Sequence, residues 1–120
     1  MGKGFKELFV WQKARDLAID VYKITTHGSF KRDYGLTDQL RRSAVSVPSN
    51  IAEGDERDTD KDAIRFFYMA KGSLAELRTQ LDIANQIDYL KEDGFQDFDE
   101  KAVTIGRMLG SLIKARSKKN

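Results

Sequence analysis

The stretch RRSAVSVPSNIAEG, residues 41–54, places a proline and several serines inside an apolar repeat. At 100° per residue, one helical face collects the apolar positions Leu40, Ala44, Val47 and Ile51. A flank of mostly polar positions runs beside that face: Gln39, Ser43, Ser46, Asn50, Glu53 and Arg57. Both patterns continue past Pro48, although a proline inside a helix costs about 3 kcal/mol. The stretch therefore predicts a single helix over residues 37–54.

Three further segments repeat apolar residues every three or four positions, and none alternates as a strand would. Helices are expected over residues 7–26, 37–54, 60–90 and 98–117. A chain of 120 residues suits one hydrophobic core, so residues 1–120 are expected to form one domain. The predicted fold is all-α, an antiparallel, up-and-down four-helix bundle.

The ends and the inner face of the third helix are also predicted from local patterns. Thr59 or Asp60 is expected to cap its N-terminus, and Gly94 is expected to turn the chain into the fourth helix. Apolar residues spaced alternately by four and three predict its inner face: Ala63, Phe67, Ala70, Leu74, Leu77, Leu81 and Ala84.

The composition argues against catalysis. The chain has no cysteine, and its one histidine, His27, falls in a connection between helices. A nucleophilic serine needs a positioned base, so the serines of residues 41–54 are not expected to react. We expect no enzymatic activity, no cofactor and no metal site.

No apolar run is long enough for a membrane span, and the start of the chain lacks the apolar segment of a signal peptide. These features predict a cytoplasmic protein with no membrane partner.

Charge is unevenly distributed although the formal net charge is only +2. Residues 88–100 are rich in acids, whereas residues 101–120 carry bases and no acid. One interpretation is a last helix whose charges complement its dipole. The other is a basic tail that binds nucleic acid.

Helix 37–54 carries more apolar surface than one face of a bundle requires. Small polar residues beside that surface allow close helix approach and supply directional hydrogen bonds. The pattern favours packing against a second surface, in an oligomer; a wide core in a monomer is the alternative.

Three blocks, FKELFVWQKARDLAIDVY, YGLTDQLRRSAVSVPSNIAEG and FYMAKGSLAELRTQL, resemble the four-helix-bundle proteins encoded in 23S rRNA intervening sequences. Those proteins are often labelled ribosomal proteins. The chain is also similar to the accessory protein of diversity-generating retroelements. The connection THGSFKRD lacks the Phe-Pro that the family commonly has there.

The resemblance implies a homopentameric ring without enzymatic activity. It assigns packing and assembly roles to Ser43, Ser46, Pro48, Asn50, Glu53 and Gly54, and to Gly72, Ser73 and Glu76. We expect two helices to approach closely at Gly72 and Ser73, with Asn50 or Glu53 hydrogen-bonding across the gap.

Two functions remain open. The first is binding of RNA or DNA backbone through basic surface: Arg41, Arg42, Arg65, Lys71, Arg107, Lys114, Arg116, Lys118 and Lys119. Most aromatic residues fall on apolar stripes; Phe30 and Tyr34, in a connection, are the expected exceptions. The second is a scaffold for another polypeptide, such as a reverse-transcriptase-like enzyme, in which the acidic residues 88–100 would matter equally.

Overall fold

The computed structural model describes residues 4–118 and consists of helices throughout, without a strand in that range. Four long helices form a bundle: α1 (Phe9–Ile24), α2 (Tyr34–Asp55), α3 (Asp60–Gln86) and α4 (Glu92–Ser117). Two short 3-10 helices, η1 (Gly4–Glu7) and η2 (Gly28–Arg32), precede α1 and α2. The prediction of an all-α, four-helix bundle is confirmed.

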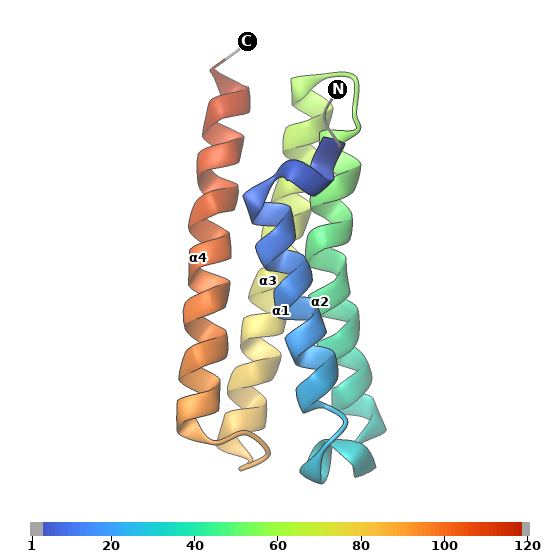
Figure 1. Cartoon of the computed structure of the whole chain (residues 1–120), viewed down its shortest axis with the longest axis vertical. Helices are drawn as coiled ribbons and strands as arrows, with labels where there is room; N and C mark the ends of the chain where they lie inside the picture. The colour runs from blue at the N-terminus through green and yellow to red at the C-terminus, as the bar shows by residue number, and fades with distance from the viewer. Residues whose placement is uncertain (1–3, 119–120) are drawn as a thin grey trace.

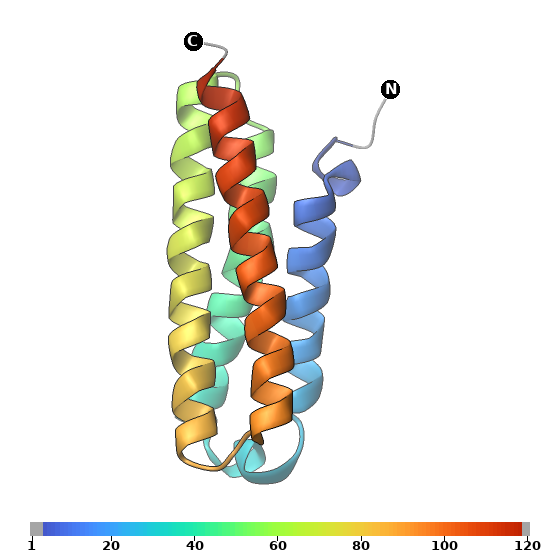
Figure 2. The same cartoon turned by 90° about the vertical axis from the view of Figure 1, so that its left-hand side faces the viewer.

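The helices lie along one long axis, and the connections between them alternate between the two ends of the bundle (Figure 1). Followed by colour, the chain descends in α1, rises in α2, descends in α3 and rises in α4. The view from the side shows α4 with α3 on one flank and α1 on the other (Figure 2).

The core forms where the apolar faces of the helices meet. All seven inner positions predicted for the third helix are buried, and so are Leu40, Ala44, Val47 and Ile51 of α2. Burial of each of the larger of these side chains stabilises the folded state by roughly 1.5–3 kcal/mol. The repeat therefore predicted the inner faces of α2 and α3 correctly.

α2 begins at Tyr34, three residues before the predicted start, because the side chain of Asp33 caps it. The Asp33 carboxylate accepts a hydrogen bond of 3.0 Å from the backbone N–H of Leu36. The helix continues through Pro48 to Asp55. The Thr59 side chain caps α3 by accepting a hydrogen bond from the N–H of Asp62 at 3.1 Å, so of the two predicted caps, Thr59 and Asp60, it is Thr59 that caps the helix.

The predicted turn at Gly94 is wrong. α3 ends at Gln86 instead of residue 90, and α4 begins at Glu92 instead of residue 98, so Gly94 lies inside a helix. The chain reverses at Asp88, which has a left-handed φ of 66°. The N–H groups of Tyr89 and Leu90 then donate to the Ala84 carbonyl at 2.9 and 3.2 Å, which closes the end of α3.

Gly54 marks a close approach of α2 and α3. A Cβ at this position would lie 2.6 and 2.9 Å from carbons of the Phe67 ring and 3.0 Å from the Ala63 carbonyl oxygen. A Cβ at Gly110, inside α4, would meet nothing within 4 Å.

Gly54→Ala should therefore lower the free energy of unfolding by about 1–3 kcal/mol, through overpacking. Gly110→Ala, the matched control, should raise it by roughly 0.5–1 kcal/mol because alanine favours the helix. Denaturant unfolding measures both. Equal effects of the two substitutions would contradict the packing described for Gly54.

Candidate interaction surfaces

Polar side chains join α2 to α3 along a strip that we call the α2–α3 seam: Ser43, Ser46 and Asn50 with Ser73 and Gln80. The Ser43 hydroxyl donates to the side-chain oxygen of Gln80 at 2.7 Å, and the Ser73 hydroxyl donates to Ser46 Oγ at 2.9 Å. Asn50 Nδ2 donates to the backbone oxygen and to Oγ of Ser46, at 2.9 and 3.1 Å. In the seam, the hydroxyl groups of these serines therefore form hydrogen bonds to other groups of the protein.

The seam corrects two details of the sequence interpretation. Asn50 bonds within its own helix, and the bonds across the gap come from the serines instead. Gln80 was not predicted, although it lies seven residues after Ser73 and both side chains are buried. A polar pair at heptad spacing on an apolar helix face was the signal that could have found it.

The remaining predicted packing residues divide between the interior and the surface. Pro48 is buried on the side of α2 that faces α1, and Gly54 packs on Phe67. Glu53, Gly72 and Glu76 are exposed. A Cβ at Gly72 would meet nothing within 4 Å, so the expected close approach of two helices at Gly72 does not occur among residues 4–118.

Several of the predicted nucleic-acid-binding cations are exposed and, within residues 4–118, form no ion pair. They are Arg42, Lys71, Arg107, Lys114 and Lys118. Arg65 is exposed and lies 3.7 Å from Asp62, the distance of a weak surface pair. Lys119 lies outside the described residues.

Arg116 is held inside the structure. Its guanidinium lies 3.0 Å from Asp55 at the end of α2 and 3.4 Å from Asp60 at the start of α3, and only 19% of its side chain is exposed. The guanidinium also lies 5.6 Å from the centre of the Phe67 ring. Arg116 therefore ties α4 to the connection between α2 and α3.

The predicted exposed aromatic residues are only partly correct. Tyr34 is 79% exposed, as expected, but Phe30 is buried at 2% exposure. Phe30 is buried because η2 folds back under the bundle. There the Phe30 and Tyr89 rings pack edge to face, with their centres 5.4 Å apart. The sequence interpretation missed Tyr22 of α1, which is 45% exposed and has the Arg41 guanidinium 4.7 Å from its ring centre.

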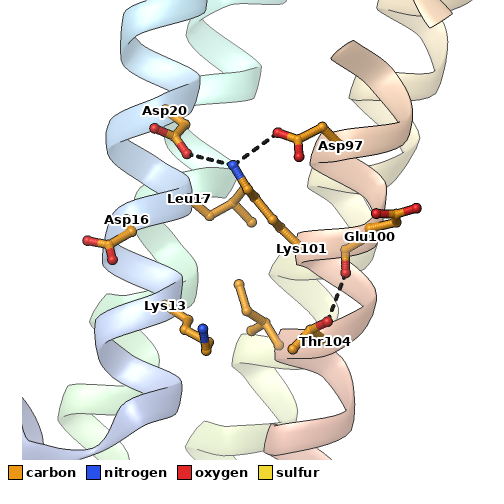
Figure 3. Close-up of a pocket in the computed structure, with 9 residues that line it drawn as sticks. Lys13, Asp16, Leu17, Asp20, Asp97, Glu100, Lys101 and Thr104 are labelled. Carbon is orange, nitrogen blue, oxygen red and sulfur yellow. Dashed lines mark hydrogen bonds and ion pairs between the residues drawn. The ribbon is translucent and has the colours of Figure 1, made fainter. Parts of the chain in front are cut away.

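A hollow of about 470 Å³ lies between α1 and α4 (Figure 3). Lys101 projects into it from α4 and bridges Asp97 at 3.0 Å and Asp20 of α1 at 3.3 Å. The hydrogen bond to Asp97, assisted by Asp20, raises the pKa of the Lys101 ammonium above its ordinary value. Asp16 and Glu100 add two further carboxylates to the lining, and Lys13 adds a second ammonium group.

None of the helices within residues 4–118 is both long and apolar enough to cross a membrane.

The fold and its surfaces define a four-helix bundle with a polar seam and exposed cations. The chain matches the family model of the 23S rRNA-intervening sequence protein over residues 6–111, and it belongs to that family. Except for Phe5, the match covers the three sequence blocks on which the resemblance rested.

A solved structure shares the fold. It is a protein of unknown function from the S23 ribosomal protein family of Bacteroides thetaiotaomicron, 21% identical, with a TM-score of 0.81. The similarity covers 88% of this chain and 98% of that one. No curated protein matches this sequence.

Proposed function

We propose that this protein is a non-catalytic, cytoplasmic bundle that binds RNA or DNA through exposed cations. The observation that supports this function is that five of the predicted cations are exposed and form no ion pair within residues 4–118: Arg42, Lys71, Arg107, Lys114 and Lys118. Such side chains can contact phosphates without first breaking an internal bond, and each contact releases counterions from the nucleic acid. Contacts of this kind carry little sequence information.

The absence of catalysis is supported by how two serines of α2 are used. Ser43 and Ser46 are hydrogen-bonded to α3 in the seam, and neither bond involves a base that could remove a proton. A hydroxyl committed in this way contributes to packing.

We further propose that the antiparallel bundle assembles into a homopentameric ring. Apolar Met69 and Ile83 are half exposed on α3, and Gly72 and Glu76 share their outward stripe at helical spacing. An exposed glycine inside a helix costs about 1 kcal/mol relative to alanine. That cost is offset if the backbone of another copy packs closely at Gly72. A ring would also multiply each basic patch and add avidity.

Nucleic-acid binding is tested with the double variant Arg107→Gln/Lys114→Gln. Fluorescence anisotropy with RNA and DNA oligonucleotides should show binding at 50 mM salt that weakens steeply at 200 mM. The variant should bind more weakly and lower the salt slope by about one to two, since two phosphate contacts are lost.

The control is Arg78→Gln/Lys101→Gln, which removes the same charge from cations that are already held in ion pairs with Asp99, Asp20 and Asp97. It should bind nearly as the unmodified protein does. Binding that is absent at 50 mM salt, or that salt does not weaken, contradicts the proposed function.

Assembly is tested with Gly72→Ala against Gly110→Ala. Both substitutions place a methyl group in open space and should stabilise the isolated helix similarly. Light scattering after size exclusion should find smaller species for Gly72→Ala alone, because only that methyl group would meet a neighbouring copy. A monomeric unmodified protein, or equal assembly of both variants, would contradict the ring.

The acid-lined hollow between α1 and α4 favours a second candidate, a scaffold for another polypeptide such as a reverse-transcriptase-like enzyme. Its carboxylates suit a basic segment of a partner. A partner held there would be released by Asp16→Asn/Glu100→Gln and unaffected by Arg107→Gln/Lys114→Gln. Binding of nucleic acid should be weakened by Arg107→Gln/Lys114→Gln and unaffected by Asp16→Asn/Glu100→Gln.

A further inference from the structure

The face formed by α1 and α2 combines an exposed aromatic ring with two neighbouring hollows. Tyr22 and Val45 line both. The first hollow, of about 390 Å³, has an apolar floor of Ala18, Ile19 and Pro48. The second, of about 510 Å³, adds Asp38, Arg41, Arg42 and Ser46.

A fixed cation lies over the Tyr22 ring. Arg41 Nε donates to Oγ1 of the buried Thr25 at 2.9 Å, which holds the guanidinium 4.7 Å from the ring centre. The Thr25 hydroxyl itself donates to the Val21 carbonyl at 2.8 Å. The ring and the guanidinium are therefore organised before any ligand arrives, which reduces the entropy that binding would cost.

Cations border the ring on both sides. Lys23 and Arg15 line the first hollow and Arg42 the second. Lys23 and Arg42 form no ion pair within residues 4–118, whereas Arg15 lies 3.0 Å from Asp16. An apolar platform with cations at its edges matches a ligand that alternates flat rings with negative charges.

We propose that this α1–α2 face binds single-stranded nucleic acid, with an unpaired base stacked on Tyr22 and flanking phosphates at Lys23 and Arg42. The inference rests on the proposed function and specifies its ligand. Bases are free to stack on a side chain only where they are unpaired, so a duplex would reach the cations and not the ring.

The test uses a single-stranded RNA with 2-aminopurine at one position, whose fluorescence falls when the base stacks. The unmodified protein and Tyr22→Phe should both quench it. Tyr22→Ala and Tyr22→Leu should lose the quenching and bind about 5–150-fold more weakly, the range expected for one stacked base. The dependence on salt should not change, because the phosphate contacts remain.

Tyr68→Ala is the matched control, since Tyr68 is a 57% exposed tyrosine on α3 with Lys71 5.9 Å from its ring centre. It should leave quenching and affinity unchanged. A duplex of the same sequence should bind the Tyr22→Ala variant and the unmodified protein equally.

The outcomes separate this inference from the proposed function. Failure of every oligonucleotide to bind at 50 mM salt overturns both. Binding that Tyr22→Ala and Tyr22→Leu affect no more than Tyr68→Ala overturns only the stacking site. Two other outcomes would assign the face to a protein contact and overturn the inference. One is that the Tyr22 variants form smaller assemblies than the unmodified protein. The other is that the bound RNA shows no quenching of 2-aminopurine and is displaced by an acidic helical peptide.

Discussion

The hydrogen-bonded contact between α2 and α3 is the constraint on which the rest of the structure depends. Buried hydroxyl and amide groups need partners, and Ser43 and Ser46 find them in Gln80 and Ser73. Sliding α2 along α3 by one turn would break both bonds across the seam and leave the buried Gln80 and Ser73 side chains without these partners, at about 1–3 kcal/mol each. Apolar contacts alone would tolerate such a shift more readily. The seam thus fixes the register of α2 against α3.

That register decides which surface groups are available for binding. It brings Gly54 onto Phe67 and places Asp55 and Asp60 together, where they hold Arg116. Arg116 is consequently part of the scaffold, whereas Arg107 and Lys114 on the same helix remain exposed. On the other side of α2, buried Pro48 forms part of the apolar floor beside Tyr22.

The sequence predicted the features that depend on local periodicity and capping. It did not predict the features that depend on contacts between distant segments of the chain. The inner faces of α2 and α3 and the Thr59 cap followed from spacing alone. The start of α4 did not, because a reversal at a left-handed Asp88 competes with the more usual signal of Gly94. The positions of Phe30 and Tyr22 depend on neighbours far along the chain, so local patterns misplaced the first and missed the second.

The most direct measurement is a double-mutant cycle on Ser43→Ala and Gln80→Leu, followed by denaturant unfolding. We predict that Ser43→Ala costs about 1–3 kcal/mol because it leaves the side-chain oxygen of the buried Gln80 without its partner. Gln80→Leu should cost less than Ser43→Ala, because the Ser43 hydroxyl also lies 3.2 Å from the Leu40 carbonyl oxygen. The double variant should recover part of that loss, with a coupling energy of about 1 kcal/mol or more. Losses that add to within about 0.3–0.5 kcal/mol, as expected for independent sites, would contradict the claim that this contact fixes the bundle.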